Sequence, residues 1–321
     1  MFFFPEIPPP PPSHSTVQMS TSLSDTSVAA QQHSAQQYNG ALLALGFSPP
    51  NGPDESTNFF HSDFDHEDMD GLMPQLPFSH MQWLSDISMM LQRLTGGFPV
   101  LNFGTSGRIV KDPAGSAHKV FRFELNRTDP IVYGSKRSEL AMAPVSPHAE
   151  YTYRFKVYLP ADYQNDATPE GIAQWHDKPD LNLGEHYKIP ALSIETLNGH
   201  FRVKGVWDSK ALTPGEDPGK GGGMYMADLG PYRKAQWNHF TVHIKWSYRD
   251  DGFVEVFEND KLVFKRTGPT YYNDQIGPYM KVGIYKWDWK ERPQLSHVDK
   301  RVVYINDIHE DEGNAAPRGK S

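Results

Sequence analysis

Short runs of alternating apolar and polar residues dominate the chain from about residue 98 onward. Each run is bounded by Pro, Gly, Asn or Asp, and helical spacing is almost absent there. Alternation with a period of two predicts β-strands that turn one face toward a core. The expected strands are residues 119–125, 135–141, 150–159, 172–176, 191–196, 200–207, 224–228, 238–247, 253–258, 261–266, 279–287 and 301–308. About a dozen such strands predict an all-β fold, a two-sheet sandwich or jelly roll.

The first hundred residues have a different texture. Residues 1–78 combine a proline run, Ser/Gln-rich stretches and acids without period, which predicts a disordered extension. Within it, the apolar islands 41–47 and 58–64 could dock on a partner. Met, Trp, Leu and Ile recur near helical spacing in residues 79–97, which predicts an amphipathic helix or linker. We therefore expect a folded domain at residues 98–310 and a disordered tail at 311–321.

Composition and charge exclude several classes of protein. The 321 residues include no cysteine, which rules out disulfides, thiolate metal sites and a cysteine nucleophile. No apolar run is long enough for a membrane span, so no membrane partner is expected. Residues 1–98 hold ten acidic residues and one base, which leaves 29 acidic and 30 basic residues, a balance of +1, for the rest. The predicted domain is therefore near neutral, and without a recognised binding motif it does not predict a nucleic-acid partner.

Polar rows recur on one face of several predicted strands, because residues i and i+2 of a strand point the same way. The rows that carry ionisable groups are Arg137 with Glu139, Gln174 with His176, and Tyr279 with Lys281 and Tyr285. Further basic rows are Arg154 with Lys156, Arg202 with Lys204, and His239 with His243 and Lys245. Unpaired rows of this kind are not tolerated in a core. Together they predict a basic, aromatic, concave sheet surface.

Three segments occur in an order that resembles a known family. They are KRSEL at 136–140, QWH at 174–176 and YMKVGIY at 279–285. The chain from about residue 98 to 308 resembles the heparin lyase I-like group of jelly-roll polysaccharide lyases, which includes fungal glucuronan lyases. Its motifs are also similar to those of jelly-roll alginate lyases. The resemblance implies a concanavalin A-like β-jelly-roll and a carbon–oxygen lyase that acts on an acidic polysaccharide.

The resemblance also implies roles for individual residues in β-elimination at a uronic acid. Arg137 and Gln174 match the positions that neutralise the uronate carboxylate. His176 matches a histidine that serves as general base or as carboxylate neutraliser. Tyr285 matches the tyrosine that protonates the leaving oxygen and in some members also abstracts the proton. The expected substrate-binding residues are Lys281, Tyr279, Glu139, Arg202, Lys204, Trp175 and Trp287, with Glu139 orienting Arg137 through an ion pair.

The sequence departs from the alginate lyase pattern in three places. Trp175 stands where a small aliphatic residue is usual, Lys286-Trp287 follows Tyr285 in place of a continuation toward glutamine, and a second downstream arginine is missing. These departures favour a glucuronan- or heparin-like polymer over alginate.

Other interpretations stay open at this point. The same face could belong to a non-catalytic carbohydrate-binding module, or to a glycoside hydrolase with a carboxylate pair in its cleft. No cofactor is expected to be required. A structural calcium ion, as in some relatives, is conceivable, but no contiguous calcium loop is visible and the metal ligands are unknown. We expect a monomer. The resemblance predicts secretion, although the first residues do not form a signal peptide.

Overall fold

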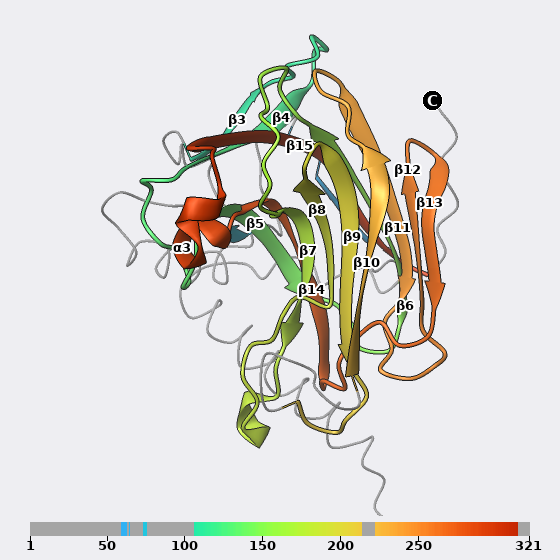
Figure 1. The fold of residues 1–321 in the computed structure, drawn as a ribbon. Coiled ribbons are helices and arrows are strands. Elements are labelled where there is room, and N and C mark those ends of the chain that lie inside the picture. Colours follow the sequence, from blue (N-terminus) through green and yellow to red (C-terminus); the bar gives the residue numbers. More distant parts are fainter. Residues whose placement is uncertain (1–58, 63, 65–72, 76–105, 214–221, 314–321) are drawn as a thin grey trace, which may run out of the picture. The chain divides into compact units, whose positions relative to one another are not determined.

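Two antiparallel β-sheets face each other in the computed structural model, which describes residues 59–62, 64, 73–75, 106–213 and 222–313 (Figure 1). Sheet A consists, in spatial order, of β13 (Lys261–Thr267), β12 (Phe253–Glu258), β11 (Trp237–Lys245), β6 (Glu150–Tyr158), β15 (Lys300–Glu312), β4 (Lys119–Asn126) and β3 (Gly107–Lys111), with β1 (Phe59–Ser62) also paired to β15. Sheet B consists of β10 (Gly222–Pro231), β9 (His200–Asp208), β8 (Leu192–Leu197), β7 (Glu170–Lys178), β14 (Ile276–Tyr285), β5 (Arg137–Pro144) and β2 (Met73–Gln75). The architecture is a jelly-roll sandwich, as the alternation predicts.

Helical structure is minor in the described part of the chain. It consists of η1 (Leu181–Leu183), α3 (Asp288–Glu291) and η2 (Pro293–Leu295). The α3 turn follows β14 directly and lies beside the end of β5 (Figure 1). Strands β12 and β13 form a hairpin joined at Asn259 and Asp260. Both of these residues have positive φ angles, 52° and 65°, which Asn and Asp tolerate better than most residues.

The core lies between the sheets and is rich in aromatic rings. Trp175 of β7 is fully buried and lies 5.2 Å from Tyr153 and 6.5 Å from Trp246 between ring centroids. Edge-to-face and tilted contacts of this kind add to the burial of apolar area. Sheet B is therefore held in place from behind by large side chains, which leaves its other face free to carry polar groups.

Two short strands fall within the region predicted to be a disordered extension. The apolar island at 58–64 contains β1, which pairs with β15, and Phe64, which is buried against Phe121 at 5.7 Å between ring centroids. The described residues of this island therefore pack against other parts of the same chain. Strand β2 pairs with β5 at the edge of sheet B. The predicted helix at 79–97, the tail beyond residue 313 and the rest of 1–78 lie outside the described residues.

Glu310 on β15 is predicted to make folding stability depend on pH. Burial raises its pKa to about 8, with Asp311 adding to the shift, and its Oε2 atom is buried without a hydrogen bond from any described residue. Since the folded pKa exceeds the unfolded value, stability is lost as pH rises from about 4.5 through 8. We expect Glu310→Gln to raise the free energy of unfolding near pH 9 and to change it little near pH 4.

Urea unfolding at both pH values checks this expectation. Glu312→Gln, an exposed glutamate on the same strand, is the matched control and should behave like wild type at both. A gain from Glu310→Gln that is the same at both pH values would contradict the assignment.

Candidate active site

The outward face of sheet B carries a grid of polar side chains set by strand register. On β14, Tyr279 is paired with His176 and Lys281 with Gln174, both on β7. Farther along β14, Tyr285 is paired with Arg137 on β5. Residues paired across antiparallel strands project to the same face. The three sequence segments that resemble lyase motifs are thus brought together on neighbouring strands β7, β14 and β5.

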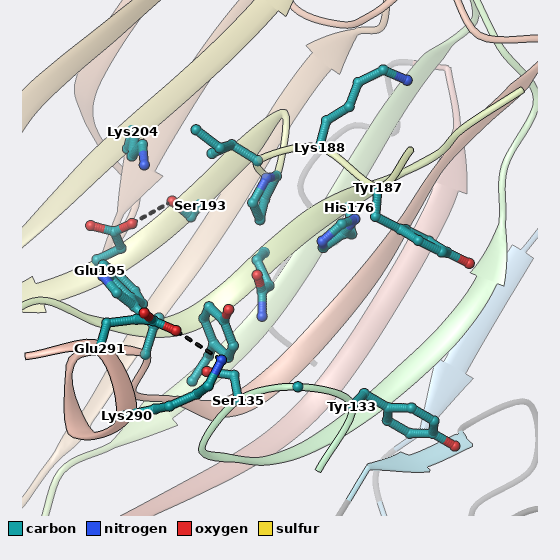
Figure 2. Close-up of a pocket in the computed structure, with 17 residues that line it drawn as sticks. Tyr133, Ser135, His176, Tyr187, Lys188, Ser193, Glu195, Lys204, Lys290 and Glu291 are labelled. Atoms are coloured by element: carbon teal, nitrogen blue, oxygen red, sulfur yellow. Dashed lines mark hydrogen bonds and ion pairs between the residues drawn. The ribbon is translucent and has the colours of Figure 1, made fainter. Parts of the chain in front are cut away.

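A cleft of about 600 Å³ opens above this grid. Figure 2 shows His176 and Tyr187 on one side, with Lys204, Ser193 and Glu195 on another. The cleft is lined by Tyr133, Gly134, Ser135, Gly171, Gln174, His176, Tyr187, Lys188, Ile189, Pro190, Ser193, Glu195, Lys204, Tyr285, Trp287, Lys290 and Glu291. Of the four expected catalytic residues, Gln174, His176 and Tyr285 therefore line one cleft. Its size is typical of a ligand site.

His176 meets the cleft as a neutral imidazole at neutral pH. Burial lowers its pKa below the usual 6.5, outweighing the contact with Asp177 that acts the other way. The Nδ1 atom lies 2.7 Å from Asp177 Oδ1, and the ring stacks on Tyr279 with 5.8 Å between centroids. A carboxylate at Nδ1 places the ring proton there and leaves Nε2 as a hydrogen-bond acceptor.

Tyr285 lies at the end of β14, and two glycines allow close approaches near it, Gly171 of β7 to Tyr285 itself and Gly283 of β14 to β5. A Cβ atom at Gly171 would lie 3.4 Å from the Cβ of Tyr285, so a larger residue there would crowd the tyrosine. Gly283 has φ of +137°, and a Cβ there would lie 2.3 Å from the backbone oxygen of Ser138. Only glycine fits this close approach. The Arg137 guanidinium lies 4.6 Å from the Tyr285 ring centroid, which is a cation–π contact.

Glu139 organises a buried charge cluster behind the cleft. It pairs with Arg137 Nη1 at 3.3 Å and with Lys281 Nζ at 3.7 Å, and it accepts a hydrogen bond from Gln174 Nε2. Burial lowers the pKa of Lys281 to about 8, even though Glu139 acts in the opposite direction. The expected Arg137–Glu139 ion pair is present.

The positions of Arg137, expected to be catalytic, and of Lys281 and Glu139, expected to bind substrate, correct part of the expected site. None of the three lines the cleft, and the Lys281 side chain is only 2% exposed. Lys281 was expected to hold a sugar carboxylate, but its ammonium is turned toward Glu139 instead. Tyr279 likewise does not line the cleft and contacts His176 from beside it. These residues support the site from behind.

The remaining expected residues divide between the cleft and the rest of the sheet. Lys204 and Trp287 line the cleft, whereas Arg202 does not and is paired with Glu195 at 2.5 Å. Trp175 is the clearest correction: it was expected to bind substrate, but its side chain points into the core. The physical reason is strand alternation, since its neighbours Gln174 and His176 take the outward face.

The predicted basic concave surface is wrong in extent. The rows on β6 and β11 belong to sheet A, not to the sheet that carries the cleft. Their charges are matched by carboxylates of sheet A and its loops. The ion pairs are Arg154 with Asp311, Lys156 with Asp307, His243 with Glu150, and Lys245 with Asp251. Alternation predicts which residues share a face but not which sheet a strand joins.

Sequence reasoning missed the loops that form the walls of the cleft. Tyr133–Ser135 before β5, Tyr187–Pro190 before β8, and Lys290 with Glu291 on α3 are the main additions. Loops have no period from which a position could be inferred. Ser193 and Glu195 on β8 were also missed, although their spacing places them on one face of a predicted strand.

The described residues contain neither a recognisable metal site nor a membrane-spanning helix. No group of three or more His, Asp or Glu side chains there is arranged to hold a metal ion, so the calcium expectation has no identified site and stays a prediction. Over the same ranges, no helix has the length and apolar character to span a bilayer.

Comparison with known proteins identifies the family and the fold. A family model described as polysaccharide lyase matches residues 101–309. Among solved structures, an endo-β-1,4-glucuronan lyase from the fungus Trichoderma reesei is similar with a TM-score of 0.56 at 18% identity, over 64% of this chain and 87% of that one. That similarity supports the shared fold.

Alginate lyases are also among the solved structures that are similar to this chain. The family 7 alginate lyase A1-II′ gives a TM-score of 0.49 at 12% identity, covering 76% of this chain and 96% of that one. An alginate lyase from a Chlorella virus gives a TM-score of 0.43 at 14% identity, covering 65% of this chain and 90% of that one. A search of curated proteins finds no match. Because the family model spans well over half of the sequence, this chain belongs to the polysaccharide lyases, carbon–oxygen lyases that act on polysaccharides.

Proposed function

We propose that the protein cleaves a uronic-acid-containing polysaccharide, glucuronan-like or heparin-like, by β-elimination. The observation that carries the proposal is the convergence of Gln174, His176 and Tyr285 on one cleft that also contains the ammonium of Lys204. A proton acceptor, a proton donor and groups that bind carboxylate are the parts that this reaction requires.

The proton transfers follow from the two ionisable side chains that face the cleft. His176 Nε2 accepts the proton from C5 of the uronate, and the C5–H electron pair moves toward the carboxylate. The C4–O bond then breaks as the C4–C5 double bond forms. Tyr285 donates its hydroxyl proton to the leaving oxygen. The proton on His176 returns to Tyr285 through solvent, so the cycle needs no oxidant, reductant or added water.

Stabilisation of the charge that develops on the uronate carboxylate comes from the floor of the cleft. Gln174 presents its amide there, with one N–H donated to Glu139. Behind it, Arg137 and Lys281 carry two positive charges against the single negative charge of Glu139. A fixed net positive charge in a water-poor layer stabilises a developing enolate without reorganisation.

The two carboxylates that line the cleft do not form a hydrolase pair. Glu195 accepts hydrogen bonds from Ser193 and Arg202, and Glu291 is paired with Lys290 at 2.9 Å. Both are therefore engaged with neighbouring side chains. A glycoside hydrolase needs an acid and a base that face the same glycosidic bond. Glu195 and Glu291 are not arranged in this way, so the cleft supports elimination better than hydrolysis.

An ultraviolet assay for the unsaturated uronate product tests the proposal. Glucuronan, heparin, heparan sulfate, alginate and pectate should be compared with the same preparation of protein. We expect absorbance to grow on glucuronan or on a heparin-type polymer. No product on any of the five, together with retained binding to one, would contradict catalysis and support the carbohydrate-binding alternative.

Lys204 is predicted to bind a uronate carboxylate at a neighbouring sugar. Among the described residues, no carboxylate lies within ion-pair distance of the Lys204 ammonium. Burial lowers the pKa of Lys204, and the nearby Glu195 carboxylate acts in the opposite direction. Loss of a charged hydrogen bond costs about 1.5–3 kcal/mol. We therefore expect Lys204→Ala to raise KM roughly tenfold or more with a smaller change in kcat.

Steady-state kinetics on the preferred polymer measure this effect. Lys261→Ala, an exposed lysine on β13 of sheet A, is the control and should leave KM unchanged. A fall in kcat at constant KM for Lys204→Ala would contradict a role in ground-state binding.

A further inference from the structure

Asp177 is a buried carboxylate in direct contact with the histidine of the cleft. Its side chain has no exposed surface, and its Oδ1 atom lies 2.7 Å from Nδ1 of His176. The His176 ring also stacks on Tyr279 and meets Tyr187 in a T-shaped contact, with 5.8 and 5.9 Å between ring centroids. Among the described residues, the directional contacts with the ring nitrogens come from Asp177, whose Oδ1 and, at 3.4 Å, backbone oxygen both face Nδ1, so they favour a proton on that nitrogen.

A second layer of charged groups holds Asp177 in place. The backbone N–H of Lys188 is shared between both Asp177 oxygens at 3.3 Å, and Lys188 Nζ lies 3.5 Å from Oδ2. The same ammonium pairs with Glu185 at 2.8 Å and with Asp274 at 2.9 Å. Figure 2 shows the Lys188 side chain directed away from the cleft residues. The loop that forms one wall of the cleft thus fixes the carboxylate that contacts His176.

The ammonium that lies beside Asp177 is held in its charged form. Burial alone would lower the pKa of Lys188, but its hydrogen bonds to Glu185 and Asp274 raise it overall, so the ammonium stays charged. Burial raises the pKa of Asp274 to about 7. The Lys188 ammonium presents this positive charge to Asp177, 3.5 Å from its Oδ2 atom.

We propose that Asp177 is a positioning residue that holds the His176 proton on Nδ1, so that an unprotonated Nε2 faces the substrate. This inference rests on the proposed function for its catalytic consequence, but not for its structural content. When Nε2 takes up the substrate proton, the resulting imidazolium is stabilised by the adjacent carboxylate. Asp177 itself forms no bond to the substrate.

Nitrogen NMR of the imidazole rings in the full-length protein tests the structural content directly. The chain has 14 histidines, so the His176 signals are identified by their absence from the spectrum of His176→Gln. We expect the wild-type ring to carry its proton on Nδ1. A proton on Nε2 in the wild type would overturn the proposal, whatever the activity of the protein.

Asp177→Asn tests the catalytic consequence. The amide can turn its N–H₂ group toward Nδ1, which moves the ring proton to Nε2 and blocks proton uptake there. We expect kcat to fall about 100-fold or more with KM little changed, and the NMR signals of His176 to change tautomer. Loss of kcat without a change of tautomer would assign Asp177 a merely structural role and overturn the proposal.

Asp307→Asn is the matched control, because Asp307 also pairs with a histidine, His309 at 2.7 Å, but on β15 of sheet A and not in the sheet that carries the cleft. We expect this variant to retain the wild-type tautomer and kcat. If the wild type turns over none of the five polymers but shows the Nδ1–H tautomer, the proposed function fails while the positioning of His176 by Asp177 stands.

Discussion

Tyr285→Phe should reduce kcat by roughly 10²–10⁴-fold while leaving substrate binding and stability nearly unchanged. The phenol supplies the proton for the leaving oxygen, and phenylalanine has none to give. The rest of the side chain is kept, so its packing against Arg137, at 4.6 Å from the ring centroid, survives. The space left by Gly171 also suits either ring. The expected loss is therefore confined to the chemical step.

Tyr187→Phe is the matched control for this measurement. Tyr187 lines the same cleft and contacts His176, but its side chain is exposed on a loop. Steady-state kinetics and thermal melting of both variants should show a large fall in kcat for Tyr285→Phe alone. A Tyr285→Phe variant that keeps kcat within a few-fold of wild type would remove Tyr285 from the proton-donor role.

Glu139→Gln should cost about 3–5 kcal/mol of folding stability, because it breaks a buried ion-pair cluster in sheet B. Glu139 is buried between Arg137 and Lys281, and its removal leaves two cations without their common partner. Burial already lowers the pKa of Lys281 to about 8. Without Glu139 that pKa should fall further, so the lysine would lose its proton near neutrality.

Urea unfolding near neutral pH measures the loss. Glu255→Gln is a suitable control, because Glu255 also meets two basic groups, Lys265 and His243, but at the exposed surface of sheet A. Surface pairs contribute about 0–1 kcal/mol, so the control should be close to wild type. An equal loss of unfolding free energy in the two variants would contradict the claim that the Glu139 cluster is shielded from water.

The sequence predicts the strands and the faces of this fold better than it predicts contacts between sheets. Alternation along β7 and β14 places Gln174, His176, Lys281 and Tyr285 on one face, because the period of a strand is a local property. Assignment of strands to sheets is a long-range property. For that reason the basic rows of β6 and β11 were assigned to the wrong surface.

The sequence also does not predict how deeply individual side chains are buried. Lys281 shares a face with Tyr285, yet it is buried behind the cleft because Glu139 attracts it there. Trp175 was expected at the cleft although its position in the alternation already indicates the core. The loop walls, and with them Lys188, depend on how connecting segments fold back over sheet B. Asp177 follows His176 directly in sequence, and that adjacency was the signal that sequence reasoning passed over.

The mass balance of cleavage tests the central claim most directly. A glucuronan oligosaccharide of defined length would be digested, and the products weighed by mass spectrometry. Elimination adds no water, so we expect each pair of fragments to sum to the mass of the substrate, with the new non-reducing end unsaturated. Fragment pairs heavier than the substrate by one water would show hydrolysis and would contradict the assignment of His176 and Tyr285 to β-elimination.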